Sequence, residues 1–403
     1  MTQIVKIGNI STQIRGVSYS KSDVIANMQD GYLPVLRANN IQEQGLVLDD
    51  FVYVPESKIS EKQRILAGDV IIAASSGSIS LVGKAASAKE DINAGFGAFC
   101  KILRPNTELV DPRYFANYFQ TQKYRQIISN LAAGANINNL KNEHLDDLEI
   151  PLPPLTEQRR IASILDQADE LRQKRLQAIE KLDQLLQATF IDMFGDPKIN
   201  PYNFNIEKLS KFYIDSKNGT KCGPFGSALK RHEYVENGIP VWSMDVITLS
   251  GEFIDKPSLW ITNEKFKELE SYSVEEGDVI ISRAGTVGKM GVVHSQYEKS
   301  LISTNLIRLR FGNNLLPEYF VALMTYCKHR LSRLQTGADG AFTHMNTGIL
   351  DNLEFPYPPI KKQKQFVDFL HRVNINKQIL LKSGKRINDL FSSLQNQAFN
   401  GTL

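Results

Sequence analysis

The segment LEIPLPPL at 148–155 returns at 353–360 as LEFPYPPI, with the leucine, the glutamate and all three prolines in place. A repeat separated by 205 residues divides this chain of 403 residues into two copies. The sequence therefore predicts two tandem copies of one structural unit. Further pairs of segments keep the same order and nearly the same separation: 31–35 with 238–241, 68–72 with 277–281, 83–84 with 288–289, 111–115 with 316–320, and 131–134 with 334–337.

Each copy begins with short runs of β-branched and aromatic residues, separated by Gly, Pro, Asn and Asp. The runs 51–54 and 306–310 are examples, and their composition is typical of β-strands. Apolar and aromatic residues at helical spacing follow Pro112 and Pro317. We expect each copy to contain a mixed, β-rich globule with helices packed on its sheet.

The last part of each copy predicts a long helix. Residues 156–194 contain neither Gly nor Pro, and 195–197 (Gly-Asp-Pro) supply a stop signal. Only Gly384 interrupts the second stretch. Apolar residues recur at helical period, at Ile161, Ile164, Leu165, Ala168, Leu171, Ile179, Leu182, Leu185 and Leu186 in the first stretch and at Phe366, Phe369, Leu370, Val373, Leu380, Ile387, Leu390, Phe391 and Leu394 in the second.

A helix of roughly 37 residues is about 55 Å long, too long to be covered by one small domain. Its apolar stripe therefore needs a partner helix, and the other copy supplies the obvious one. Arg175 and Asn376 occupy positions within the stripes. A polar side chain there either sets the register of the pair or marks a solvated kink.

The predicted fold class is α+β, with two tandem mixed α/β domains joined by two long helices that pair as an antiparallel coiled coil with pseudo-two-fold symmetry. The predicted segments are 1–150 for the first domain, 151–196 for the first long helix, 197–355 for the second domain and 356–403 for the second long helix. This symmetry would place the domains at opposite ends of the helices. If each domain touches B-DNA, an offset of about 55 Å corresponds to about 16 base pairs.

The composition is that of an ordinary globular protein, with 42% hydrophobic and 23% charged residues. The formal charge of +3 neither demands nor excludes a polyanionic partner. The three cysteines lie far apart and form no C-x-x-C motif, which indicates neither a disulfide framework nor a thiolate zinc site. The N-terminal residues lack a signal-peptide pattern, and no apolar run approaches the roughly 20 residues of a membrane span. We therefore expect a cytoplasmic protein outside the membrane.

Motifs for catalysis are missing, which favours a binding role. The segment 77–85 resembles a phosphate-binding P-loop, but five residues separate its glycines and Ala85 replaces the required hydroxyl. The segment Asn-Pro-Tyr at 200–202 lacks the second proline of an adenine-methyltransferase motif. Asp196 and Asp215 fit only the last part of a nuclease motif, and the six histidines show no metal-binding spacing. We predict no catalytic residue and no metal ligand in this chain.

Two motifs and the degenerate second copy together resemble the specificity subunit of type I restriction-modification enzymes. The motifs are LPPLTEQRRIA at 152–162 and FIDMFGDP at 190–197, and the resemblance covers essentially the whole chain. It implies that 1–150 and 197–355 are target recognition domains. Each would read one half of a bipartite, asymmetric DNA site, and the two long helices would set the spacer.

The same resemblance implies the partners, which are double-stranded DNA, two methyltransferase subunits and two restriction or motor subunits. S-adenosylmethionine, ATP and Mg are then expected in the partner subunits, with no cofactor in this chain. Lys362 stands where the first copy has Glu157, which leaves open asymmetric methyltransferase contacts or mere sequence drift. The residues expected at the partner interface are Glu157, Gln158, Arg159 and Gln363.

DNA-reading residues are expected on loops with hydrogen-bonding side chains, because Arg pairs with guanine and Asn or Gln with adenine in the major groove. Trp242, Ser243 and Asp245 align with Leu36, Arg37 and Asn39, so the two domains should read different bases. We predict DNA contacts in the first domain at Arg15, Ser18, Tyr19, Lys21, Arg37, Asn39, Asn40 and Asn136, and in the second at Lys221, Gly223, Phe225, Ser227, Lys230, Arg231, Trp242, Ser243, Asp245, Arg283, Thr286 and Thr343.

The preferred interpretation is a non-catalytic subunit for DNA recognition and assembly, with two alternatives left open. The first is the specificity part of a single-chain restriction enzyme, which predicts metal-dependent cleavage by this chain alone. Met1 directly precedes the first repeat, which disfavours that alternative. The second is a partner-binding scaffold that has lost DNA reading, which predicts no sequence preference.

Overall fold

The computed structural model describes residues 3–42, 45–76, 81–134, 139–224, 228–283, 286–327 and 345–403, with the side chains of 132–134 outside this description. The chain forms two compact units. Unit 1 consists of Met1–Ile179 and Leu380–Leu403, and unit 2 consists of Glu180–Ile379. The division falls inside two long helices, α4 (Leu155–Phe194) and α8 (Ile360–Asn400). Each unit therefore contains one β-rich domain and part of both helices.

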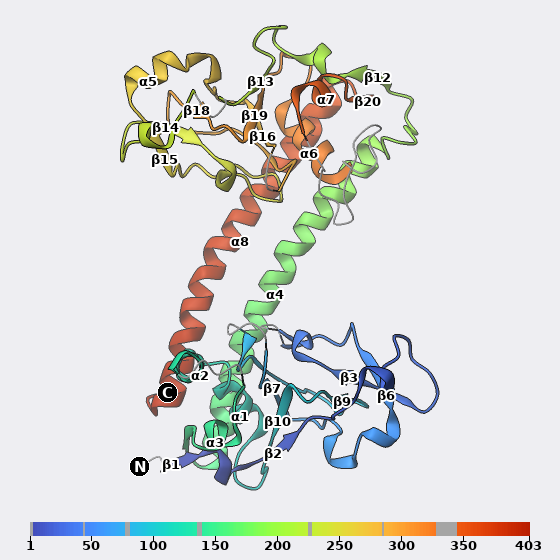
Figure 1. Ribbon diagram of the computed structural model, residues 1–403, viewed down its shortest axis with the longest axis vertical. Coiled ribbons are helices and arrows are strands. Elements are labelled where there is room, and N and C mark those ends of the chain that lie inside the picture. Colours follow the sequence, from blue (N-terminus) through green and yellow to red (C-terminus); the bar gives the residue numbers. More distant parts are fainter. Residues whose placement is uncertain are drawn as a thin grey trace. The chain divides into compact units, whose positions relative to one another are not determined.

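Unit 1 is built on two sheets and a short two-stranded ribbon (Figure 1). A four-stranded antiparallel sheet has the order β2 (Ser11–Arg15), β10 (Cys100–Pro105), β7 (Val70–Ala73) and β8 (Ala85–Ser87). A mixed sheet has the order β6 (Val52–Pro55), β3 (Tyr32–Leu36) and β9 (Gly95–Phe96). The ribbon pairs β1 (Gln3–Lys6) with β11 (Glu149–Leu152), and β4 (Ile41–Gln42) pairs with β5 (Gly45–Leu46).

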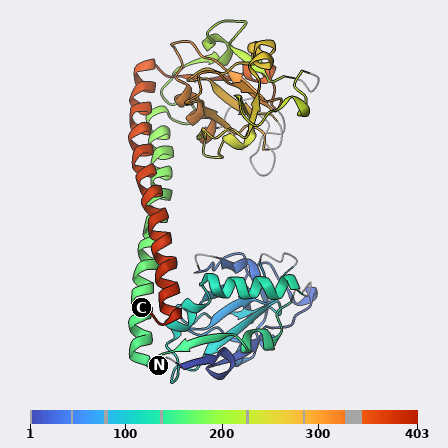
Figure 2. The same cartoon turned by 90° about the vertical axis from the view of Figure 1, so that its left-hand side faces the viewer.

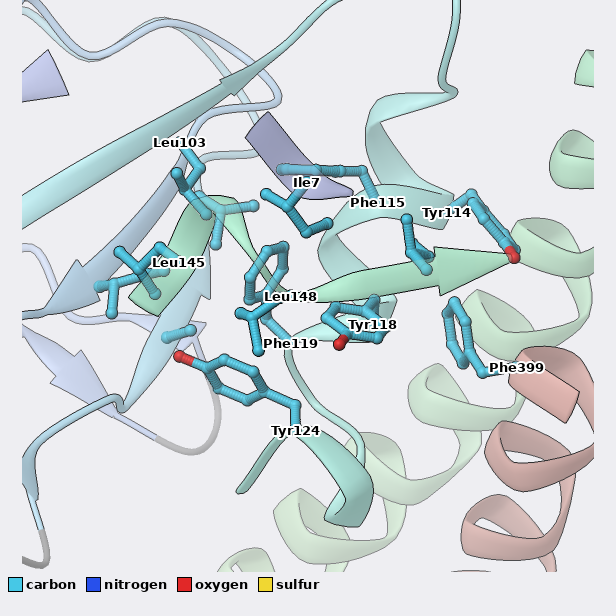
Figure 3. Close-up of a cluster of buried hydrophobic side chains, with 14 of the residues drawn as sticks. Ile7, Leu103, Tyr114, Phe115, Tyr118, Phe119, Tyr124, Leu145, Leu148 and Phe399 are labelled. Carbon is cyan, nitrogen blue, oxygen red and sulfur yellow. The ribbon is translucent and has the colours of Figure 1, made fainter. Parts of the chain in front are cut away.

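Helices α1 (Pro112–Tyr118), α2 (Gln122–Gly134) and α3 (Asn142–Asp146) complete the domain of unit 1. Asp111 caps α1 by accepting hydrogen bonds from the backbone of Arg113 and Tyr114, and Pro112 occupies the first turn. The buried face of α1 carries aromatic side chains that pack against the sheet and against Phe399 of α8, whose ring centroid lies 5.1 Å from that of Tyr114 (Figure 3).

Unit 2 repeats the strand order of the two larger sheets and of the ribbon, but its described residues form no strand pair equivalent to β4 and β5. Its antiparallel sheet has the order β13 (Thr220–Cys222), β19 (Leu306–Leu309), β16 (Val279–Ser282) and β17 (Met290–Val292). Its mixed sheet has the order β15 (Leu259–Ile261), β14 (Ile239–Trp242) and β18 (Leu301–Ile302), and β12 (Asn205–Lys208) pairs with β20 (Glu354–Tyr357). The helices of this domain are α5 (Asn263–Glu268), α6 (Pro317–Cys327) and α7 (Thr347–Asp351).

The repeated Gly-Asp-Val-Ile-Ile motif explains part of this common topology. Its valine and isoleucines form β7 and β16, which are buried on both faces. Its aspartate, Asp69 or Asp278, directly precedes that strand, is buried, and binds a guanidinium from the neighbouring strand β10 or from the residue after β19. Arg104 donates to Asp69 at 2.8 and 2.7 Å, and Arg310 donates to Asp278 at 2.8 and 2.8 Å. A buried carboxylate needs such a partner, so we assign these two ion pairs to the stability of the fold.

Helices α4 and α8 have 40 and 41 residues and are somewhat shorter than the predicted segments 151–196 and 356–403. Each starts directly after a Pro-Pro pair whose residues cannot continue a helix towards the N-terminus. The first helix ends before Gly195, whose φ of 75° is left-handed. Gly384 lies inside α8 without breaking it. No helix in the described ranges is long and apolar enough to cross a membrane.

In unit 1 the two helices run side by side in antiparallel directions (Figures 1 and 2). The guanidinium of Arg172 lies 4.8 Å above the ring of Phe391, and Arg175 donates a hydrogen bond to Ser383. The residue number of the contact on α8 thus decreases as the residue number on α4 increases, as it does in an antiparallel pair. The side chain of Arg175 also passes 3.7 Å from the Cβ that a larger residue would have at Gly384. The predicted place of Arg175 in the helix pair is confirmed.

In unit 2 the helices are also antiparallel, but the polar residue between them is Lys377. Its Nζ lies 3.0 Å from Oδ1 of Asp183 on α4 and 3.3 Å from Oε1 of Glu252. Burial acts to lower the pKa of Lys377, but the two carboxylates outweigh it and the pKa is raised. The prediction for the adjacent Asn376 was wrong, because that side chain is exposed. Leu171 and Leu185, which were placed in the apolar stripe, are 60% and 46% exposed.

The α+β fold class with two tandem domains is confirmed. The four predicted segment boundaries stay predictions, because the compact units divide inside the helices and do not coincide with those segments.

Cys100 offers a simple check of the buried sheet in unit 1. Its side chain is fully buried, and this burial raises the pKa of the thiol to about 12. We expect iodoacetamide at pH 8 to leave Cys100 unmodified in the folded chain and to modify it fully in urea. Peptide mass spectrometry measures both, and fast modification without urea would show that the sheet opens.

Candidate DNA-binding surface

In unit 1 the loops that follow β2 and β3 start side by side at Gly97. The N–H of Val17 donates to the carbonyl of Phe96 at 2.7 Å, and the N–H of Gly97 donates to the carbonyl of Leu36 at 2.8 Å. A Cβ at Gly16 would collide with the carbonyl of Gly97, so this crossing requires glycine. The two predicted DNA-reading loops of the first domain are therefore brought together.

Unit 2 builds the same junction from different residues. The N–H of Ser303 donates to the carbonyl of Trp242 at 2.8 Å, and the N–H of Gly223 donates to the carbonyl of Leu306 at 2.9 Å. A Cβ at Gly223 would collide with the carbonyl of Ser303, as at Gly16. The loops after β13 and β14 thus leave from one place, and the predicted DNA contact of Gly223 stays a prediction.

Arg37 and Asn39 form the polar tip of the loop after β3, and Asp50 accepts hydrogen bonds from both side chains. Nη2 of Arg37 donates to the backbone oxygen of Asp50 at 2.8 Å and to its Oδ2 at 3.1 Å. Nδ2 of Asn39 donates to the same Oδ2 at 2.7 Å. Both bonds of Arg37 to Asp50 use Nη2, so within the described residues its Nη1 edge is left for another acceptor. This arrangement fixes a guanidinium and an amide on one exposed loop.

Four further candidates of the first domain lie at the end of β2 and on the loop that follows it. Arg15, Ser18 and Lys21 are exposed, and Tyr19 is half-buried. Burial raises the pKa of the Tyr19 phenol, although the charge of Arg37 acts in the opposite direction. Tyr19 therefore stays neutral at physiological pH and retains its hydroxyl as a donor close to Arg37.

The equivalent loop of unit 2 presents an acid in place of a base. Asp245 accepts hydrogen bonds from Ser243 and from Ser258, the latter at 3.2 Å, and its side chain is exposed. Lys230 and Arg231 are exposed on the other loop of the junction, where the backbone N–H of Lys230 donates to Glu233 at 2.5 Å. The junctions share a backbone design and differ in their exposed side chains.

Three further candidates of unit 2 are less exposed or more distant along the chain. Nζ of Lys221 lies 5.0 Å from the ring centroid of Tyr272. Arg283 is half-buried after β16, and Thr286 is exposed in the same loop. Asn136, Phe225, Ser227 and Thr343 lie outside the described residues.

Two predicted DNA contacts need correction. Asn40 is 1% exposed, and its amide donates to the carbonyls of Val47 and Asp49 at 2.9 and 2.6 Å. Trp242 is fully buried and packs edge-on against Phe253, with 4.9 Å between the ring centroids. Both side chains belong to the interior of their domains, so neither is available to a base in this conformation.

Two predicted partner contacts also need correction, because Gln158 and Gln363 are 1% and 0% exposed. Oε1 of Gln158 accepts from the N–H of Asp111 at 2.8 Å, and its Nε2 donates to the carbonyls of Leu109 and Pro153 at 3.3 and 2.8 Å. Gln363 repeats the pattern with the backbone of residues 316, 314 and 358 at 3.0, 3.3 and 2.9 Å. Each glutamine ties the start of a long helix to its own domain.

Glu157 and Arg159 are the predicted partner residues that stay near the surface. Arg160 binds the carboxylate of Glu157 at 2.7 Å and lowers its pKa. Arg159 is exposed, with Nε 3.9 Å from Asp111. In the second copy, Lys362 lies over the rings of Tyr202 and Phe204 at 4.9 and 5.4 Å. The two helix starts thus offer different charges.

Asp50 is the residue at this surface that the sequence did not reveal. Its φ of 47° is unusual for a residue other than glycine, and no pattern in the sequence marks it as the partner of Arg37.

Within the described ranges, no group of three or more His, Cys, Asp or Glu side chains is placed to hold a metal ion.

A family model described as "Type I restriction modification DNA specificity domain" matches residues 2–181 and 226–390. The matches cover most of the chain and fall once in each copy of the repeat. The chain therefore belongs to the type I restriction-modification DNA specificity family.

Two relatives are each 30% identical to this chain. They are the type I restriction enzyme EcoKI specificity subunit of Escherichia coli, aligned over 99% of this chain and 89% of the relative, and the StySPI specificity subunit of Salmonella potsdam, aligned over 98% and 88%. A solved structure described as concerning the assembly of the type I R-M system covers 100% of this chain and 98% of its own, with a TM-score of 0.57 at 18% identity. The solved structure of the type I restriction-modification S subunit from M. genitalium has a TM-score of 0.54 at 16% sequence identity. It covers 99% of this chain and 96% of its own chain. The two structures support the fold.

Proposed function

We propose that this chain is the DNA sequence-specificity subunit of a type I restriction-modification complex. It reads a bipartite, asymmetric DNA site, with one half-site for each domain, and directs methyltransferase and restriction subunits to that site. The chain itself is non-catalytic. S-adenosylmethionine, ATP and Mg belong to the partner subunits, and the complex works in the cytoplasm.

The observation that carries this proposal is that both units contain the same backbone junction, whereas the polar side chains on the loops that leave it differ. In unit 1 the loop after β3 carries Arg37 and Asn39, whereas in unit 2 the equivalent loop carries Ser243 and Asp245. Arg and Asn side chains suit guanine and adenine, and a carboxylate suits the amino group of cytosine. A pair of domains with one backbone design and different polar tips suits an asymmetric site.

The long helices support the assembly role. Large apolar side chains on them are exposed, and such residues at a protein surface favour a protein partner. They are Leu171, Leu176, Leu381 and Leu390 in unit 1, with exposed fractions between 44% and 60%, and Leu185, Ile375 and Ile379 in unit 2, with fractions between 46% and 60%. We propose that two methyltransferase subunits cover these positions, with the restriction subunits bound to the methyltransferase subunits.

The test is methylome sequencing of a clean host that expresses this chain together with its cognate methyltransferase subunit, compared with the methyltransferase subunit alone. We expect an asymmetric bipartite motif with methylated adenine only when this chain is present. Co-purification without any motif would support the scaffold that has lost DNA reading. Metal-dependent cleavage by the purified chain alone would support the single-chain enzyme, and failure to co-purify would contradict the proposal.

An exchange of residues 1–150 for those of another family member tests whether each domain recognises one half-site. We expect one half of the methylated motif to change and the other half to remain, because the second domain keeps its own junction. The same methylome measurement decides the matter, and an unchanged motif, or a change in both halves, would contradict the assignment of one half-site to each domain.

Arg37→Ala is expected to weaken specific DNA binding by about 1–3 kcal/mol and to relax the sequence preference in one half-site only. Lys89→Ala is the matched control, because Lys89 is an exposed cation of the same domain away from the junction. Binding of the complex to a randomised DNA library, followed by sequencing, measures both effects. Equal losses on all sequences for Arg37→Ala would assign it to a phosphate contact.

A further inference from the structure

A groove of about 560 Å³ opens in unit 1 where the ribbon of β1 and β11 meets the start of α4. Its walls are mostly leucine and proline, with Gln158 as the polar residue at the helix start and Glu108 as an acidic residue at the opening. The lining includes Glu108, Leu109, Leu152, Leu155 and Gln158.

Unit 2 contains the same construction with one decisive difference. Tyr357 stands at the position of Leu152, since each is the last residue of its strand and each pairs with the first residue of the opposite strand. The hydroxyl of Tyr357 donates to the carbonyl of Asn314 at 2.7 Å, and its ring lies 4.5 Å from that of Phe212. The phenol of this residue therefore fills the corresponding space in unit 2.

The acceptor for such a hydroxyl is also present in unit 1. The carbonyl oxygen of Asn314 accepts a hydrogen bond from Nε2 of Gln363 at 3.3 Å. The carbonyl oxygen of Leu109 accepts one from Nε2 of Gln158 at the same distance. Asn314 gains a second, shorter bond from Tyr357, whereas the described residues of unit 1 supply no such donor to Leu109. Leu152 is half-buried, and its side chain has no hydrogen-bond donor to offer this oxygen.

We propose that this groove receives a tyrosine side chain from a protein partner, with its hydroxyl bonded to the carbonyl oxygen of Leu109. The ring then packs against the leucine and proline walls, as the ring of Tyr357 packs within unit 2. Glu108 is exposed at the opening, where the second copy has the neutral Asn313, so it favours a basic residue beside the tyrosine. This binding site goes beyond the proposed function, because it needs neither DNA nor a recognition loop.

Leu152→Tyr closes the groove with the chain's own side chain and copies the arrangement of unit 2. Leu152→Met is the matched control, because it roughly conserves volume and brings no donor. Tyr357→Leu is the reciprocal variant and should open a second groove in unit 2. Circular dichroism confirms that each variant is folded before binding is measured.

The first experiment uses N-acetyl-L-tyrosinamide as the probe and the full chain with labelled leucine methyl groups. We expect saturable chemical-shift changes at Leu109, Leu152 and Leu155 of the wild-type chain. The changes at Leu109 and Leu155 should persist in Leu152→Met and be absent in Leu152→Tyr. The phenylalanine analogue should bind about fivefold more weakly, because it lacks the hydroxyl. No saturable change in the wild-type chain, or the same change in Leu152→Tyr, would overturn the proposal.

The second experiment identifies the partner and rests on the proposed function. We expect Leu152→Tyr to lower the affinity for the cognate methyltransferase or restriction subunit by about tenfold relative to Leu152→Met, while the methylated motif keeps its sequence. Wild-type affinity for both subunits would overturn the assignment to a protein partner. Because the probe experiment involves no partner, its result separates failure of the groove from failure of the proposed function.

Discussion

The Phe366→Ala chain should lose about 3–5 kcal/mol of the free energy of unfolding of unit 2. Phe366 is fully buried in the first turns of α8, where it packs against two phenylalanines of α4. Its ring centroid lies 5.2 Å from that of Phe190 and 5.7 Å from that of Phe194. Truncation to alanine removes these ring contacts and leaves a cavity between the two helices and the domain.

Tryptophan fluorescence in urea measures this loss, because both tryptophans of the chain, Trp242 and Trp260, lie in unit 2. Ile375→Ala is the control on the same helix, since Ile375 is 60% exposed and its truncation should change the free energy of unfolding by about 0.5 kcal/mol or less. A loss below about 1 kcal/mol for Phe366→Ala would mean that the two helices do not pack through this residue.

Gln158→Leu is expected to cost unit 1 about 2–4 kcal/mol, because it leaves buried backbone groups without their partners. The side chain of Gln158 bonds the N–H of Asp111 and the carbonyl of Leu109, both just before α1, and the carbonyl of Pro153, just before α4. Leucine fills a similar volume but offers neither donor nor acceptor. The helix start should therefore loosen from the domain even though apolar packing is retained.

Amide hydrogen exchange of β7 and β10 measures this effect, since unit 1 contains no tryptophan. Protection should fall by about 30-fold to 1000-fold, which corresponds to the expected loss of free energy. Gln167→Leu is the control, because Gln167 is exposed on the same helix. Gln363→Leu should have the equivalent effect in unit 2. Unchanged protection in Gln158→Leu would show that water replaces the side chain without cost.

The repeat and the helical periodicity predicted most of the fold. The offset between 148–155 and 353–360 gave the two domains, and the absence of Gly and Pro gave the long helix α4. Periodicity located the apolar stripe less well than it located the helix. Neighbouring residues on a helix differ by about 100° in direction, so a small drift of the stripe moved the polar position from Asn376 to Lys377.

The candidate site was predictable in its residue types and less so in its geometry. Arg37 and Asn39 follow an apolar strand in the sequence, which was enough to propose a polar loop. Their common partner Asp50 lies more than ten residues away and depends on the folding of that loop. Gln158 and Gln363 were placed at a partner interface because they lie in a family motif. A motif shows that a position matters, but it does not show which way the side chain points.

The composition of the two units has a consequence for folding during synthesis. Unit 2 is one continuous stretch, Glu180–Ile379, whereas unit 1 needs Leu380–Leu403 to complete it. Phe391 and Phe399 belong to the core that Tyr114 and Tyr118 begin, although about 270 residues separate them along the chain. Domains generally close in the order in which they are translated. In this protein the face of the N-terminal core that Phe391 and Phe399 cover therefore stays open on the ribosome until α8 has emerged.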